Sequence, residues 1–412
     1  MNSLATKISS FWARVNGSLF PALEDADVEM TPKLYKFVAL LDFLQIELFL
    51  PPHSPYQVGA KPHDRRCLAR AFVAKAFYNA TDTKAFRDRL LHDKDLRKVC
   101  GWPFRGSVPS ESTFSRAFAW FADLGLTDLV LEAHVHVWFG ETIIRDVATD
   151  STAIEAREKP VTRKKAAEEM VAAAIIAPEV AVPAPAAPSS ATTLPESGLT
   201  EAVPVKKAKA KQRGKKVATQ PVLQNMSTPV EQSRLARQID QVPEIALLEL
   251  PTACDVGCKT DSKGNKNYWI GYKFHVRVAE GNVPLMAVTT AASVHDSQVT
   301  IPMMKISDRR VTSLYELKDR AYDAYWIRQA AELAGHVPII DYVKRRGQER
   351  ARELEPDRAE HYKGRTVVER FNARLKDEFG GEMLRVRGNR KVHTHLMFGL
   401  LVIFADQVLR LV

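Results

Sequence analysis

The first third of the chain, residues 1–138, has apolar residues at three- and four-residue spacing, which is typical of helices that pack on one side. The pattern is clearest in RRCLARAFVAKAFYNA (65–80) and KAFRDRLLHDKDLRKVCG (84–101). Another helix is expected to begin in PSESTFSRAFAWF (109–121), where Ser110 is a plausible N-cap. We therefore predict an all-helical N-terminal region.

Apolar residues alternate with smaller or more polar ones in NYWIGYKFHVRVAEGNVPLMAVTTAA (267–292), which predicts strands instead of helices. A turn at 280–282 should join the first strand to a second one that reaches about residue 290. Together with the further elements, this alternation predicts an α/β region with a mixed sheet. These elements are strands at 141–152, 311–319 and 338–343, and helices from residue 296, at 324–335 and at the apolar C-terminus, 393–412.

Residues 161–245 differ in composition from both neighbouring regions. They are rich in Ala, Pro, Val and Ser, and KKAKAKQRGKK (206–216) is a block of cations without an acid. We predict a flexible insertion, because such a segment lacks the aromatic and branched residues that would offset its ordering entropy. The basic block could contact a DNA backbone, or it could be a solvated linker. The chain thus divides into a helical region, 1–138, an α/β region, 139–160 and 246–412, and the insertion, 161–245.

The net charge of +10 favours an anionic partner, most simply nucleic acid. Four scattered cysteines are too few for a disulfide framework, which fits a reducing cytoplasm. Cys254 and Cys258 have C-x3-C spacing without a second pair nearby, so two ordinary thiols are favoured over a zinc site. The longest apolar run, 396–405, is half of the ~20 residues that a membrane span needs, and no N-terminal signal is evident. We expect a soluble protein.

Two predicted strands end in a carboxylate, at Asp150 and at Asp319, and a later helix carries Glu369. If the strands are neighbours, the three acids converge on one small volume. Clustered carboxylates repel one another unless a cation intervenes, so such a site calls for divalent metal ions. Two Mg²⁺ or Mn²⁺ ions could activate an attacking oxygen and stabilise the leaving oxygen of a phosphodiester. Asp146 lies about 13 Å from Asp150 along the strand, too far to share the ion.

The acid Glu369 stands among cations in HYKGRTVVERFNARLK (361–376). On one α-helix, Tyr362, Arg365, Glu369 and Lys376 would share a stripe about 60° wide, while the opposite side is apolar. The two cations would hold backbone phosphates, and the tyrosine could hydrogen-bond a phosphate or pack beside a base. The alternative is a solvated face whose charges form weak pairs at helical spacing.

The start of the helix expected after Ser110 is a second candidate DNA contact. Ser112, Thr113, Ser115 and Arg116 would reach phosphates or base edges if this were the second helix of a helix-turn-helix. An ordinary capped helix in a bundle is the equal alternative.

The run Tyr362-x2-Arg365-x3-Glu369-x6-Lys376 resembles the YREK signature of bacterial insertion-sequence DDE transposases in spacing and residue type. Other segments resemble that family and occur in its order, and the helical N-terminus is similar to the DNA-binding region that precedes its catalytic domain. The similar segments are DST (150–152), GYKFH (271–275), ASVHDS (292–297) and DRAYD (319–323).

This resemblance implies a ribonuclease-H-like fold, a mixed sheet flanked by helices, in which Asp150, Asp319 and Glu369 hold two Mg²⁺ or Mn²⁺ ions. It implies a DNA transposase that cleaves at terminal inverted repeats and joins the ends to target DNA. A homodimer in the synaptic complex and a cytoplasmic, nucleoid-associated location in a bacterium are further expectations. The alternatives are a transposase-derived DNA-binding protein without catalysis and a general metal-dependent nuclease.

The pair His295-Asp296 would also suit a metal phosphohydrolase, but that chemistry needs further His and Asp residues that the sequence does not place. We expect Asp296 to cap the helix that follows it. We expect His275, on the predicted strand, to be a structural histidine.

Overall fold

The computed structural model describes residues 4–52, 63–161, 233–260, 263–344, 347–348, 352–382 and 384–411. All of them belong to one compact unit, and a second unit, 172–232, lies outside the described residues, as does the basic block 206–216. No helix in the described part is long and apolar enough to cross a membrane.

Six strands form one mixed sheet: β1 (Ile143–Glu155), β2 (Asp255–Thr260), β3 (Lys266–Ala279), β4 (Val283–Ala291), β5 (Thr312–Lys318) and β6 (Val337–Ile340). Their order is β2-β3-β1-β5-β6, and β4 also pairs with β3. β1 is antiparallel to β3 and parallel to β5, which is parallel to β6. The mixed sheet is consistent with the ribonuclease-H-like domain that the resemblance implies.

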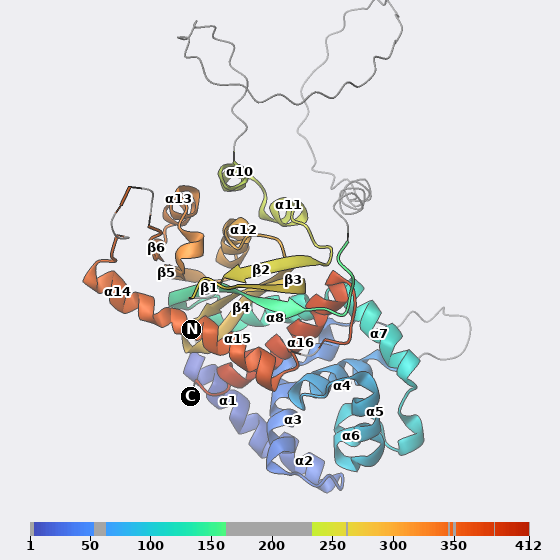
Figure 1. Ribbon diagram of the computed structural model, residues 1–412. Coiled ribbons are helices and arrows are strands. Elements are labelled where there is room, and N and C mark those ends of the chain that lie inside the picture. The colour runs from blue at the N-terminus through green and yellow to red at the C-terminus, as the bar shows by residue number, and fades with distance from the viewer. Residues whose placement is uncertain are drawn as a thin grey trace, which may run out of the picture. The chain divides into compact units, whose positions relative to one another are not determined.

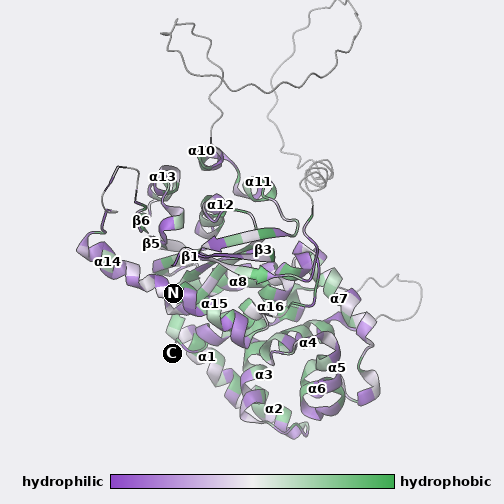
Figure 2. Cartoon of the chain, in the orientation of Figure 1, coloured by the Kyte–Doolittle hydropathy of each residue, from purple (hydrophilic) through white to green (hydrophobic). Residues whose placement is uncertain are grey.

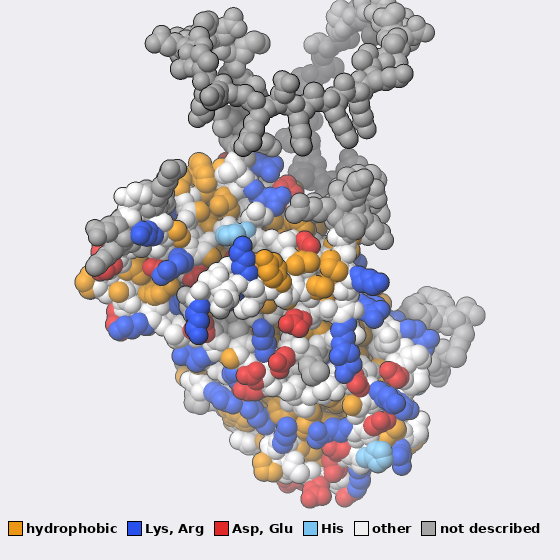
Figure 3. All heavy atoms as spheres, in the orientation of Figure 1, with side chains coloured by type: hydrophobic (Ala, Val, Ile, Leu, Met, Phe, Trp, Pro, Cys, Tyr) orange, Lys and Arg blue, Asp and Glu red, His pale blue; other side chains and the backbone are white. Residues whose placement is uncertain are grey.

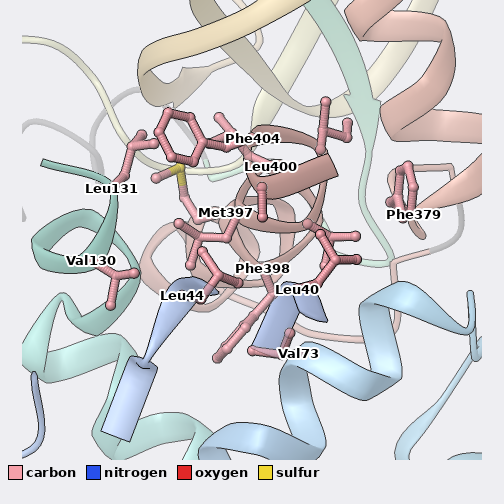
Figure 4. Packing of buried hydrophobic residues seen from close by; sticks show 14 of the residues in the cluster. Leu40, Leu44, Val73, Val130, Leu131, Phe379, Met397, Phe398, Leu400 and Phe404 are labelled. Carbon is pink, nitrogen blue, oxygen red and sulfur yellow. The ribbon is translucent and has the colours of Figure 1, made fainter. Parts of the chain in front are cut away.

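One face of the sheet shares a hydrophobic core with the N-terminal helices and with α16 (Asn389–Val408) (Figure 1). Nearly every side chain of α16 from Leu396 onward is buried, because strands lie on one side of this helix and other helices on the other. Figure 4 shows Met397, Phe398, Leu400 and Phe404 of α16 among side chains of the N-terminal helices. The helices before β1 are α1 (Leu4–Arg14), α2 (Phe20–Asp25), α3 (Pro32–Leu44), α4 (Arg65–Phe77), α5 (Thr83–His92), α6 (Lys94–Cys100), α7 (Glu111–Leu124) and α8 (Leu126–Phe139), with short turns η1 (Val15–Leu19), η2 (Ile46–Phe49) and η3 (Arg105–Ser107).

Four helices lie on the opposite face: α10 (Arg234–Asp240), α11 (Pro243–Leu248), α12 (Ser297–Asp308) and α13 (Tyr325–Leu333) (Figure 1). Two smaller hydrophobic clusters fix α12 and α13 there. Leu235 and Ile239 of α10 pack against one of these clusters. The C-terminal end of the predicted insertion, from residue 233, is therefore helical and packed, because its apolar residues find partners on α12 and α13.

A helical run leads into α16: α14 (Pro356–Tyr362), the 3-10 turn η6 (Lys363–Arg365) and α15 (Thr366–Glu378). The single helix predicted over 361–376 is thus tightened at η6, where Gly364 comes close to β5. A Cβ on Gly364 would stand 3.1 Å from Leu317 Cδ1. The apolar face predicted for α15 is confirmed, because Val367, Val368, Phe371 and Leu375 are buried, and Figure 2 shows both hydrophobic and hydrophilic residues on this helix.

β3 changes its partner at Gly271, pairing with β2 before it and with β4 after it. A Cβ on Gly271 would lie only 2.1 Å from the backbone oxygen of Ile154 on β1, so this approach requires glycine. The hairpin to β4 is confirmed, with the η4 turn at Glu280–Asn282. β2 is a strand that the sequence pattern did not predict.

Candidate active site

Asp150 and Asp319 lie at corresponding positions of two adjacent parallel strands. The last paired residues of β1 and β5 are Ala148 and Leu317, and each acid stands two residues further along. β5 ends just before Asp319, as predicted. β1, however, does not end at Asp150: it continues to Glu155, because β3 pairs with it along that whole length. Asp150 is therefore held within a strand and not in a turn after one.

Burial governs the ionisation of both acids. The Asp150 side chain is 23% exposed, and burial, together with the nearby Asp319, raises the pKa of Asp150 to about 6. Burial likewise raises the pKa of Asp319. Each carboxylate accepts one short-range backbone hydrogen bond, Asp150 Oδ1 from Ser151 N at 2.8 Å and Asp319 Oδ1 from Ala321 N at 2.9 Å. Two carboxylates are thus held close together in a partly dry site.

The guanidinium of Arg365 lies between Glu369 and Asp150. Its Nη2 donates to Glu369 Oε1 at 2.5 Å, and its Nη1 is 4.0 Å from Asp150 Oδ2. The Arg365 side chain is 19% exposed, and its guanidinium carbon is 5.7 Å from the centre of the Tyr362 ring. Three members of the predicted stripe are therefore brought together beside Asp150, and Arg365 compensates the negative charge there.

The donor set of this region suits a hard divalent cation, because it consists of carboxylate oxygens without thiolates or imidazoles. Tyr322 adds a buried hydroxyl that has no hydrogen-bond partner among the residues that the structure describes. Burial and the charges of Asp296 and Asp150 raise the pKa of Tyr322, so this hydroxyl remains a proton donor. Within the described ranges, no three His, Cys, Asp or Glu side chains are grouped closely enough to hold a metal ion together. The Glu369 carboxylate pairs with Arg365 instead of joining the two aspartates.

Lys376 stands two helical turns beyond Glu369, about 10 Å along α15. Burial and the neighbouring Lys259 of β2 lower the pKa of Lys376. Its side chain lines a cavity of 110 Å³ together with Asn79, which follows α4, and His395 of α16.

A second cavity adjoins the first and reaches α7. This cavity has a volume of 220 Å³ and shares Ala80, Gly380 and His395 with the first. Ser115, Arg385 and Lys75 also line it. Burial lowers the pKa of Lys75 to about 8. The two adjoining cavities therefore lead from Lys376, the last residue of the stripe, to α7.

At the start of α7, Ser112 and Arg116 are exposed and Thr113 is half-buried. Ser110 takes the N-cap position, but its side chain does not cap the backbone. Its hydroxyl bonds instead to the hydroxyls of Ser112 and Thr113, at 2.9 and 3.1 Å.

Asp296 differs from its expected role. It takes the N-cap position of α12, but its side chain makes no capping bond, because it is drawn to other partners. Asp296 Oδ1 accepts from Lys273 Nζ at 3.0 Å and from Ser151 Oγ at 2.8 Å. Lys273 was not among the residues predicted from the sequence, although the motifs GYKFH and ASVHDS contain Lys273 and Asp296. His295 Nδ1 is 2.7 Å from Ser297 Oγ.

Three other expectations concern residues near the site. His275 is fully buried and its Nε2 is 2.9 Å from Thr290 Oγ1, in keeping with a structural histidine. Asp146 is engaged elsewhere, with Arg145 and His361. Cys254 is buried and Cys258 exposed, and both are free thiols.

Comparison with known families gives two matches. Residues 254–405 match the model described as Transposase DDE domain, and residues 23–120 match the one described as Transposase domain (DUF772). The first match includes Asp319 and Glu369, whereas Asp150 precedes it. No curated protein and no solved structure gives a match. The two family matches support a transposase of the DDE type.

Proposed function

We propose, on the premise of a DDE-type transposase, that this protein cleaves the ends of an insertion sequence and joins them to target DNA. Asp150, Asp319 and Glu369 would hold two Mg²⁺ or Mn²⁺ ions, and a homodimer would act in the complex that pairs the two ends. The single observation that carries the proposal is the placement of Asp150 and Asp319 at the same level of adjacent parallel strands, beside the helix that bears Glu369.

Bound divalent ions would supply Lewis-acid stabilisation of the phosphodiester oxygens. The chain itself must orient the acids, and the backbone bonds from Ser151 and Ala321 do so for the two aspartates. Arg365 neutralises the acids in the DNA-free protein. When phosphate enters, its guanidinium has a stronger, bidentate partner available.

A path for the DNA backbone follows from the same geometry. Arg365 directly precedes α15 and Lys376 lies near the C-terminal end of that helix, and the two adjoining cavities lead from Lys376 to α7. Figure 3 shows Lys and Arg side chains spread over the face that carries α15, with acidic side chains grouped among them. We propose that Tyr362, Arg365 and Lys376 hold the cleaved end. Beyond the two cavities, Ser112, Thr113 and Arg116 would contact DNA.

The proposal is tested with Asp150→Ala, Asp319→Ala and Glu369→Ala, each assayed for Mg²⁺-dependent cleavage and strand transfer on labelled end DNA. Each variant should lose both activities while it still folds and binds the ends. Asp377→Ala is the matched control, because Asp377 is an exposed acid on the same helix as Glu369. A variant of the three that cleaves like the wild type would not belong to the metal site.

Two other outcomes would identify the alternative functions. Cleavage without any joined product would indicate a general nuclease. End binding without cleavage by the wild-type protein, over a range of Mg²⁺ and Mn²⁺ concentrations, would indicate a DNA-binding protein derived from a transposase.

A further inference from the structure

An ion pair lies directly behind the two aspartates of the candidate active site. Lys273 and Asp296 are 3.0 Å apart, and their side chains are only 14% and 22% exposed. Asp296 also accepts the hydrogen bond from Ser151 Oγ. Because the backbone N–H of Ser151 donates to Asp150 Oδ1, a single residue connects Asp296 to that carboxylate.

Asp296 is ionised at neutral pH. Burial opposes the ionisation of Asp296, but the neighbouring His275 and Lys273, together with the hydrogen bonds from Lys273 and Ser151, keep its pKa below the usual range. His275 Nδ1 is 3.9 Å from Asp296, yet burial lowers the pKa of His275 to about 4, so the ring is neutral near pH 7. The described side chains around Asp296 thus supply one full compensating cation, Lys273.

The field of Asp296 reaches the active site. Ser151 bridges the two carboxylates, because it donates through Oγ to Asp296 and through its backbone N–H to Asp150, so the charge of Asp296 lies close to the candidate metal ligands. Lys273 has the opposite charge and lies at the same place, so it must weaken this field. Interactions of this kind act over several ångströms in a partly dry site, without direct contact.

We propose that Asp296 and Lys273 are positioning residues that set the electrostatic potential at the metal-binding carboxylates, Asp296 strengthening and Lys273 weakening the binding of a divalent cation. The inference rests on the proposed function, because it takes Asp150 and Asp319 as metal ligands. Neither Asp296 nor Lys273 ligates the ion itself.

The test is a calorimetric titration of the full-length, DNA-free protein with Mn²⁺ at low and moderate salt. Asp296→Asn and Lys273→Gln each remove one charge and keep hydrogen-bonding atoms. Affinity should fall roughly three- to ten-fold in the first variant and rise by a similar factor in the second. The double variant, which removes both charges, should return close to the wild-type value.

If the ion pair had only a structural role, the Mn²⁺ affinity would change in the same direction in both single variants, since both break the same pair. A change of Mn²⁺ affinity in the same direction in both variants, or no change in either variant, would overturn the inference. Ser151→Ala, which keeps both charges and removes one hydrogen bond, should leave the affinity within about two-fold of the wild-type value, because the field is unchanged. Thermal unfolding of each variant verifies that it folds.

Asp150→Ala separates this inference from the function on which it rests. If Mn²⁺ binding survives that substitution unchanged, the proposed metal site is wrong. If Asp150→Ala removes binding but the charges of Asp296 and Lys273 have no effect, only the present inference fails.

Discussion

At the scale of single residues, Arg365 has two competing partners. In the DNA-free protein its guanidinium pairs with Glu369 and lies near Asp150. A divalent cation and a phosphate would both change this arrangement, the first by repelling Arg365 and the second by attracting it. Arg365 should therefore favour DNA binding and oppose metal binding.

Replacement of Arg365 or Lys376 by alanine is expected to weaken end binding by about 1 to 3 kcal/mol, the range for one charge-assisted hydrogen bond. The dependence of binding on salt should become shallower by about one released counterion for each substitution. End-DNA binding across a salt series measures both quantities.

The control for these variants is Arg370→Ala, because Arg370 lies on the same helix but bonds to Asn282, away from the stripe. Mn²⁺ affinity of the free protein should stay equal or improve when Arg365 is removed. Wild-type salt slopes and cleavage in both variants would mean that the two cations form only a solvated helix face.

At the scale of elements, strands β3 and β5 are joined across β1 by buried charges. Arg277 donates to both oxygens of Glu316, at 2.9 and 2.5 Å, and Lys318 bonds to the same carboxylate. All three side chains are buried, so none of them can be hydrated if a partner is removed. The network thus stabilises the strand that ends at Asp319 only as long as it is complete.

Arg277→Met should destabilise the fold by about 3 kcal/mol, because it leaves Glu316 with reduced compensation in a dry environment. Arg309→Ala is the matched control: it breaks the exposed pair with Glu244, and its cost should be below about 1 kcal/mol. Urea unfolding measures both changes. Similar losses of stability in the two variants would show that the buried network contributes no more to stability than the exposed ion pair.

The same network predicts a dependence on pH. Burial alone would raise the pKa of Glu316, but Arg277 and Lys318 lower it to about 2, from an ordinary value of 4.5. A folded-state pKa below the unfolded one contributes stability above the unfolded value. This contribution should be complete above pH 4.5 and be lost as the pH falls from there toward 2. In Arg277→Met, the loss over this window should be smaller.

At the scale of the whole molecule, the N-terminal helices and the sheet share one core instead of forming separate cores. Asp406 of α16 illustrates this: it pairs with Lys36 of α3 at 2.7 Å and with Arg374 of α15 at 2.8 Å. The stripe on α15 and the candidate contacts on α7 are therefore fixed relative to each other through α16.

Two deletions test which part of the predicted insertion belongs to this core. Removal of 165–231, joined by a short Gly/Ser linker, should leave the free energy of unfolding nearly unchanged, because the deleted sequence is Ala-, Pro- and Lys-rich without a periodic apolar face. Removal of 165–248 should cost about 2 to 4 kcal/mol more, since it takes away Leu235, Ile239 and the rest of α10 and α11. Equal stability of the two proteins would show that these helices contribute nothing.

Local pattern determined much of the fold. Spacing identified the N-terminal helices, the β3–β4 hairpin and the apolar face of α15, because each depends on residues that are near in sequence. It also placed Asp319 at the end of a predicted strand, 311–319. The three acids and the stripe on the helix also came from this pattern, the resemblance to a known family supported their catalytic and DNA-binding roles, and these roles stay predictions.

Tertiary structure decided what depends on distant partners. β1 extends past Asp150 because β3 lies beside it, and α10 is helical because α12 and α13 cover its apolar side. Asp296 leaves its capping role because β1 and β3 bring Ser151 and Lys273 to it. No local pattern encodes these pairings, since a hydrogen bond or ion pair between remote segments exists only after the chain has brought them together.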